Sequence, residues 1–275
     1  MGVILAALSA FVYGIADFAG GRATRYAPSQ VVTLVSQLGG FVPVLALVLF
    51  VPSDGPTARN LVAGAIGGLC GGAGLMLLYH GLSVGTMSLV SPVCAVVAAI
   101  VPVVAGVVGG DRPGAWSLLG IGVAITAIAL VGLSGPLGAN RRGLGAALGA
   151  GAGFGFFFVA LAHSGGRPGL WPLVAARPAS MALAWLMAHR AGVRITLGGA
   201  PPTLVLGAGI LDMTANLLFL FAAGRGQLAI VGVVASLYPT STVMLAGWLD
   251  HERLHPVQWV GLGAAAAALA LVSLP

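Results

Sequence analysis

The sequence has little charge. It contains no lysine, and only 7% of its 275 residues are charged. A chain of this composition cannot build the polar surface of a water-soluble globule, which excludes a soluble enzyme. All twelve basic residues are Arg, scattered singly or in pairs, and this argues against nucleic acid as a partner. A phosphate-binding P-loop requires a Lys, so we expect no direct ATP hydrolysis and no cofactor.

Cysteine is also scarce, with only Cys70 and Cys94. Both lie in apolar runs, where a thiol is usually a small buried hydrophobe and not half of a disulfide. Apolar residues, by contrast, are abundant: 59% of the chain is hydrophobic, and the mean hydropathy is +1.05. Apolar runs near twenty residues recur from end to end, and each is long enough to cross a hydrocarbon core of about 30 Å. The sequence therefore predicts a polytopic membrane protein.

Clusters of Arg, Pro, Gly and Asp separate ten such runs, and we expect each run to be one transmembrane helix. The predicted spans are 2–20, 30–51, 61–82, 86–108, 114–134, 143–162, 169–188, 203–223, 227–249 and 256–274.

The two halves of the chain resemble each other at a shift of 141 residues. Residues 111–134 and 252–275 then share nine identities in 24 positions. This predicts two five-helix repeats, 1–137 and 138–275. Because each repeat crosses the membrane an odd number of times, the second starts on the opposite side and runs inverted. The predicted fold class is an all-α polytopic membrane protein with ten transmembrane helices in two inverted-topology repeats.

Inverted repeats are typical of carriers, because each half can adopt the other's shape and open a central site to alternate sides. A channel is a weaker alternative, since the sequence has no rings of charge.

Polar residues inside the spans are the strongest signals for a site. A charge in hydrocarbon costs about 2.5 kcal/mol or more, and therefore tends to face a cavity or a partner. Asp212 lies near the middle of its predicted span, and Asn216 follows one turn later on the same face. We expect this pair to line a polar pocket that holds an ammonium group; the alternative is a structural carboxylate paired with Arg177. Asp17, nearer a span end, is expected to face water.

Aromatic and proline residues complete the predicted cavity. Amphipathic rings occur at corresponding places in the two halves and suit a roomy cavity that accepts apolar and aromatic groups. Prolines inside spans are expected to kink their helices and act as hinges. The predicted cavity residues are Tyr13, Tyr79, His80, Phe154, Asp212, Asn216 and Tyr238, and the predicted hinges are Pro92, Pro102 and Pro239.

Glycines at every fourth position predict flat helix faces and close packing. They are Gly64, Gly68 and Gly72 in the third span and Gly145, Gly149 and Gly153 in the sixth.

Two short motifs offer an alternative function, an intramembrane hydrolase. His251, Glu252 and His255 match the zinc motif H-E-x-x-H, but Pro256 disfavours a helix at His255, and we expect no metal site. Ser83 lies in a G-x-S-x-G pentad between two predicted spans, and not in the strand–turn–helix that a nucleophile elbow requires. A loop derived from the repeat explains the first motif better, because Glu252-Arg253 corresponds to Asp111-Arg112, and chance in a chain with 44 Gly explains the second.

Several features together carry a family resemblance. Each half has an acid–Arg step before its last span, Asp111-Arg112-Pro113 and Glu252-Arg253. The segments LLYHGLSVGTMSLVSP and LFLFAAGRGQLAIVGVVASLYPTSTVMLAGWLDHERL look like paired core helices. With the ten spans and the repeat, the whole chain resembles the EamA branch of the drug/metabolite transporter superfamily, and within it the bacterial amino-acid exporters of the YddG type.

The resemblance implies a carrier, not an enzyme, that exports amino acids, aromatic and apolar ones included, and related small metabolites by alternating access. It also implies a multi-pass protein of the inner membrane with cytoplasmic termini, whereas the Arg distribution on its own would place the termini outside. The expected partners are the small-molecule substrate and the lipid bilayer, with a monomer as the expected state and a dimer as the alternative.

Overall fold

The structure is a computed structural model that describes residues 1–275 except 86, 133–142, 165–168, 250–254, 273 and 275. The described residues form eleven α-helices and no strand. The helices are α1 (Gly2–Ala23), α2 (Ser29–Leu47), α3 (Ala58–Val84), α4 (Met87–Val108), α5 (Ala115–Gly132), α6 (Leu144–Ala162), α7 (Trp171–Arg190), α8 (Pro202–Ala223), α9 (Leu228–Ala235), α10 (Pro239–Leu249) and α11 (Pro256–Val272). The predicted repeat boundary at 137–138 lies outside the described residues.

The helices coincide with the predicted spans except at 227–249, which is two helices. Helix α9 ends at Ala235, and α10 begins at Pro239. Proline has no N–H to continue a helical ladder, so a break just before Pro239 is physically reasonable. The Ser236 hydroxyl donates back to the Gly232 carbonyl at 2.8 Å, which satisfies one of the last carbonyls of α9. The sequence predicted a hinge here, and the structure has a discontinuous helix.

The other two predicted hinge prolines lie inside a continuous helix. Pro92 and Pro102 are both within α4, which stays helical from Met87 to Val108. Pro102 lies against α9, because a Cβ added at Gly232 would overlap its ring. The glycine therefore allows α4 and α9 to approach closely around a proline.

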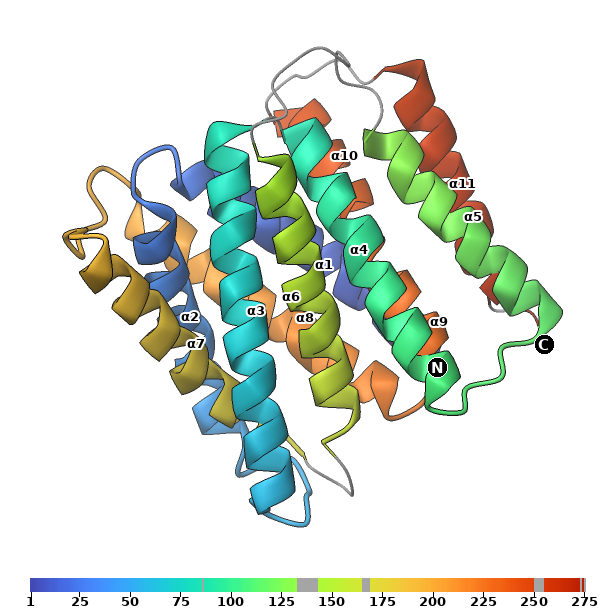
Figure 1. The fold of residues 1–275 in the computed structure, drawn as a ribbon, viewed down its shortest axis with the longest axis horizontal. Coiled ribbons are helices and arrows are strands. Elements are labelled where there is room, and N and C mark those ends of the chain that lie inside the picture. Colours follow the sequence, from blue (N-terminus) through green and yellow to red (C-terminus); the bar gives the residue numbers. More distant parts are fainter. Residues whose placement is uncertain (86, 133–142, 165–168, 250–254, 273, 275) are drawn as a thin grey trace.

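The helices are arranged as a bundle with two peripheral pairs (Figure 1). Helices α5 and α11 pack against each other at one end, and α2 and α7 pack against each other at the other end. Between them, α1 packs on α8, and α3 packs on α6 and on α7. Both chain ends lie on the same side of the molecule, at the lower right of Figure 1.

Glycines set the closest of these contacts, as the sequence predicted for the third span. On α3, a Cβ at Gly64 or Gly68 would overlap a backbone carbonyl oxygen of α7, and a Cβ at Gly72 would lie 2.7 Å from the Ser180 Cβ. The prediction for the sixth span holds only in part. A Cβ at Gly145 would meet nothing within 4 Å, whereas Gly153 lies tightly against α3.

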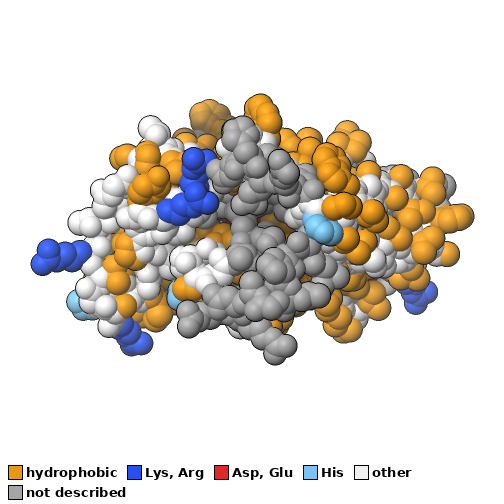
Figure 2. Space-filling view, turned by 90° about the horizontal axis from the view of Figure 1, so that it is seen from above, with side chains coloured by type: hydrophobic (Ala, Val, Ile, Leu, Met, Phe, Trp, Pro, Cys, Tyr) orange, Lys and Arg blue, Asp and Glu red, His pale blue; other side chains and the backbone are white. Residues whose placement is uncertain are grey.

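The outer surface suits a hydrocarbon environment. Within the described residues, six helices are long and apolar enough to cross a membrane: α1, α2, α3, α4, α6 and α8. The end of the molecule that α5 and α11 form is covered by hydrophobic side chains (Figure 2), among them the exposed Trp116 and Trp259. The chain is a multi-pass membrane protein; ten crossings remain a prediction.

Candidate functional site

A cavity lies at the centre of the bundle, between α1, α2, α3, α6, α7 and α8. The space in which the centre of a water molecule fits is about 40 Å³. One wall is apolar, formed by Phe154, Phe157, Phe158, Leu75 and Leu173 together with glycines of α3. The polar residues that line the cavity are Tyr13, Asp17, Gln37, Arg177, Ser180, Asp212, Asn216 and Tyr238.

An ion pair is the strongest polar contact at this cavity. Nη2 of Arg177, on α7, lies 2.8 Å from Oδ2 of Asp212, on α8. The Arg177 side chain is 5% exposed and that of Asp212 is 19% exposed. A guanidinium in so dry a place needs a carboxylate, because a buried charge without a partner is strongly destabilising. The sequence analysis gave pairing with Arg177 as the alternative role for Asp212, and the ion pair agrees with it. The Asp212 side chain is partly exposed, however, and also lines the cavity.

Asn216 and Tyr13 extend the ion pair into a network across two helices. Nδ2 of Asn216 donates to Oδ2 of Asp212 at 3.1 Å, and it also donates to the Asp212 carbonyl oxygen. The Tyr13 hydroxyl, on α1, donates to Oδ1 of Asn216 at 2.7 Å. The one-turn spacing of Asp212 and Asn216 makes the first contact local, whereas the second ties α1 to α8. The network therefore fixes the position of the carboxylate.

Three other polar groups of the cavity have no such partner. Oε1 of Gln37 is buried and accepts no hydrogen bond within the described structure, and the buried Tyr238 hydroxyl has only the weakly polar Cys94 thiol beside it. Asp17 is 6% exposed, and among the described residues no hydrogen bond or ion pair involves its carboxylate. The prediction that Asp17 faces water is therefore wrong, because the face of α1 that carries Tyr13 and Asp17 is turned into the bundle.

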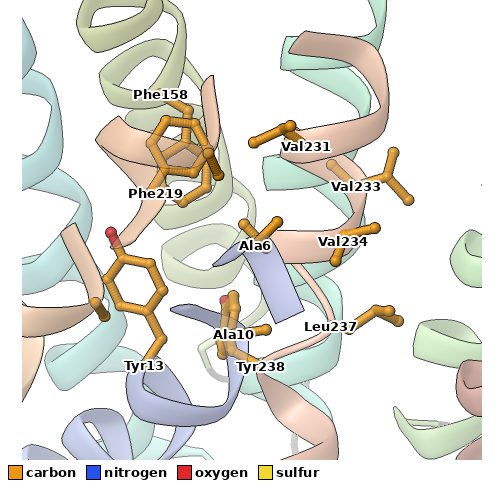
Figure 3. Packing of buried hydrophobic residues seen from close by; sticks show 14 of the residues in the cluster. Ala6, Ala10, Tyr13, Phe158, Phe219, Val231, Val233, Val234, Leu237 and Tyr238 are labelled. Carbon is orange, nitrogen blue, oxygen red and sulfur yellow. The ribbon is translucent and has the colours of Figure 1, made fainter. Parts of the chain in front are cut away.

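Aromatic rings form a compact wall beside this network (Figure 3). Phe158 of α6 stacks on Phe219 of α8, with ring centroids 4.2 Å apart, and the Tyr13 ring lies 6.0 Å from Phe158. Figure 3 shows the rings of Phe158 and Phe219 beside Val231 of α9, with Tyr238 near Ala10 of α1. The apolar wall comes from both halves of the chain, so the cavity lies where the halves meet.

Five of the seven predicted cavity residues line this cavity: Tyr13, Phe154, Asp212, Asn216 and Tyr238. The other two lie elsewhere. Tyr79 is buried, with its ring against α1 where Gly20 has no Cβ to block it. His80 follows on α3 with an exposed side chain.

The structure also brings residues to the cavity that sequence reasoning missed. Gln37 and Ser180 line the cavity. Both are polar residues in largely apolar helices, and this feature could have identified them as cavity residues from the sequence. For Asp17, the signal was its position one turn after Tyr13 on the same helix face.

The residues of the hydrolase alternative gain no support from the described structure. His251 and Glu252 lie outside the described residues, and His255 is exposed just before α11. The Ser83 hydroxyl is exposed and donates to the backbone carbonyl of His80. Within the part of the chain that the structure describes, no group of three potential metal ligands occurs.

Comparisons with known proteins agree with this architecture. Residues 1–133 match the EamA-like transporter family. A solved structure described only as "Crystal structure of protein" has the same fold, with a TM-score of 0.75 at 16% sequence identity over 97% of this chain and 98% of that one. No curated protein matches the sequence. The family match covers 133 of the 275 residues, and the structural match shows the same fold over both halves.

Proposed function

We propose that the protein is a secondary transporter of the EamA family that exports amino acids, including aromatic and apolar ones, and related small metabolites by alternating access through the central cavity. The observation that carries this proposal is the composition of the cavity wall. It combines a guanidinium, two carboxylates and an aromatic wall within one space at the centre of an apolar bundle. A zwitterion with an apolar side chain has the complementary groups.

The arrangement assigns a role to each wall. Arg177 has five N–H donors and lines the cavity, and the described contacts engage only its Nη2 group, which leaves other N–H groups to bind a substrate carboxylate. Asp212, which is 19% exposed and lines the cavity, binds the ammonium group in this scheme, with Asn216 holding the carboxylate in place. Phe154, Phe157 and Phe158 receive the side chain.

The packing of the two halves supports alternating access. Helix α1 of the first half packs on α8 of the second, and the corresponding α6 packs on α3. Likewise α3 packs on α7, and α8 packs on α2. Equivalent helices of the two halves thus make equivalent contacts, so each half can adopt the conformation of the other. The cavity space of about 40 Å³ has room for a few waters only, so the helices have to move apart to admit an amino acid.

Counterflow in proteoliposomes tests the proposal. Vesicles that contain the purified protein and unlabelled L-leucine or L-phenylalanine should take up the labelled amino acid transiently against its gradient. The double variant Arg177→Gln/Asp212→Asn removes both charges of the pair and should lose this uptake. The exposed Arg225→Gln, at the end of α8, is the matched control and should keep it. Non-saturating flux would favour a channel, and no flux of any amino acid would refute the function.

We propose further that the protein lies in the inner membrane as a monomer with cytoplasmic termini. Reporter fusions at both ends that are active only in the cytoplasm test the orientation, and mass measurement in detergent tests the oligomeric state.

A further inference from the structure

The carbonyl oxygen Oε1 of Gln37 is a neutral acceptor at the cavity that the proposed binding scheme does not use. Gln37 lines the cavity from α2 and is 5% exposed, and no described residue donates a hydrogen bond to its Oε1. In contrast, the Tyr13 hydroxyl bonds to Asn216, and the Ser180 hydroxyl bonds to a backbone carbonyl of α7. A buried acceptor without a donor costs free energy, and a donor that enters the cavity would offset this cost.

Gln37 lies beside the ion pair of the cavity. Gly40 follows it by three residues on α2, and a Cβ there would lie 3.4 Å from Cζ of Arg177 and 2.7 Å from the Gly209 carbonyl oxygen of α8. Because Gly40 has no side chain, the guanidinium can lie against α2. Asp212 follows Gly209 by three residues on α8 and also lines the cavity. The amide, the guanidinium and the carboxylate therefore come together where α2 packs on α7 and α8.

The charges beside Gln37 determine which donor fits its oxygen. In the proposed binding scheme, Arg177 binds the substrate carboxylate and Asp212 binds the ammonium group. A carboxylate and an apolar side chain have no hydrogen-bond donor. A primary ammonium has three N–H groups, and when Asp212 accepts one of them, two remain for other acceptors. The ammonium is thus the part of an apolar amino acid that can pair with Oε1 of Gln37.

We infer that Gln37 is a specificity-determining residue, whose Oε1 accepts an N–H of the substrate ammonium, so that the protein prefers primary amines to tertiary ones. This inference rests on the proposed transport function and names the class of amine. A carboxylate attracts any cation, whereas a neutral acceptor stabilises only an N–H group that points toward it. An N,N-dimethylated amino acid has one N–H, which Asp212 engages. The Gln37 oxygen then stays unpaired, and a site with an unpaired buried acceptor rejects its ligand.

Competition in proteoliposomes with the full-length protein tests this role. Counterflow of labelled L-leucine is measured against unlabelled L-leucine and against N,N-dimethyl-L-leucine. The ratio of the two half-inhibitory concentrations, dimethyl-leucine over leucine, reports the preference. Gln37→Met retains nearly the same shape without the amide oxygen, and it should lower this ratio about tenfold, as expected for one hydrogen bond to a charged group. The steric cost of the methyl groups is common to both proteins and cancels in the comparison.

Two further variants separate the hydrogen bond from a structural role of the side chain. Gln37→Glu retains an oxygen acceptor and should keep the wild-type ratio. Gln30→Met lies two turns earlier on α2, where Gln30 bonds to Ser29 and is not among the residues that line the cavity, and this matched control should also keep the ratio. A structural role of Gln37 would lower the uptake of both amines alike. An unchanged ratio in Gln37→Met, or an equal fall in Gln37→Glu, overturns the inference.

The wild type alone keeps the inference testable if Gln37→Met is inactive. It should require at least tenfold more N,N-dimethyl-L-leucine than L-leucine for half inhibition, and equal competition overturns the role of Gln37. Leucine counterflow without this preference leaves the proposed transport function intact. No counterflow of any amino acid refutes the transport function and the inference together.

Discussion

The Arg177–Asp212 pair offers the sharpest test of the packing at the cavity. In Asp212→Asn the Arg177 guanidinium, only 5% exposed, loses the carboxylate at 2.8 Å. Removing one partner of a buried pair costs about 3–5 kcal/mol, because the other charge stays buried without compensation. The Asp212 side chain is 19% exposed, so we expect the lower end, about 3 kcal/mol, for Asp212→Asn and a similar loss for Arg177→Gln.

The double variant Arg177→Gln/Asp212→Asn removes both charges and should be more stable than the sum of the single losses predicts. We expect a coupling free energy of about 2 kcal/mol. The assay is reversible unfolding in mixed micelles of increasing denaturing detergent, followed by circular dichroism. Arg225→Gln, at an exposed position, should change the free energy of unfolding by less than about 0.5 kcal/mol. Additive single losses in the double variant would refute the ion pair.

Three further predictions follow from individual contacts. Gly68→Leu would place side-chain atoms on a carbonyl oxygen of α7 and should cost about 1–3 kcal/mol in the same unfolding assay, whereas Gly122→Leu, with nothing within 4 Å of its Cβ position, should cost little. Tyr13→Phe removes the 2.7 Å hydrogen bond to Asn216. It should raise the substrate concentration for half-maximal counterflow roughly fivefold, which corresponds to about 1 kcal/mol, and leave the total uptake capacity unchanged. Asp111→Ala leaves the first turn of α9 without its 2.9 Å acceptor and should destabilise the protein by about 1 kcal/mol, while Asp111→Asn retains an acceptor and should lose less.

The helices could be predicted from the sequence because apolar runs and their Pro, Gly and Arg boundaries are local features. Pro239 indicated a hinge in the predicted span 227–249, but the sequence did not predict that this span is two separate helices, α9 and α10. A proline inside a span can be accommodated, as Pro92 and Pro102 are in α4, or can coincide with a helix end. Which of these occurs depends on how neighbouring helices satisfy the backbone, and sequence spacing does not contain that information.

The candidate site could be predicted in part. Asp212 and Asn216 are one turn apart on one helix, so their contact is a local consequence of sequence. Arg177 could be named as a partner, but its depth could not be fixed. Asp17 was expected to face water because it lies near the end of its predicted span. Helix α1 is apolar on all sides, and its periodicity does not indicate which face is buried. The inward face is set by the contact of α1 with α8, where Tyr13 bonds to Asn216, 203 residues further along the chain.

The most direct test of the central cavity is substrate protection of a single cysteine. In a chain with Cys70→Ala and Cys94→Ala, Phe154→Cys places a thiol on the cavity wall, and Phe156→Cys places one on the outer face of the same helix, where Phe156 is 56% exposed. In variants that retain counterflow, L-leucine should slow the labelling of Phe154→Cys by a thiol reagent and leave that of Phe156→Cys unchanged. Equal labelling of Phe154→Cys with and without leucine would contradict a substrate site in this cavity.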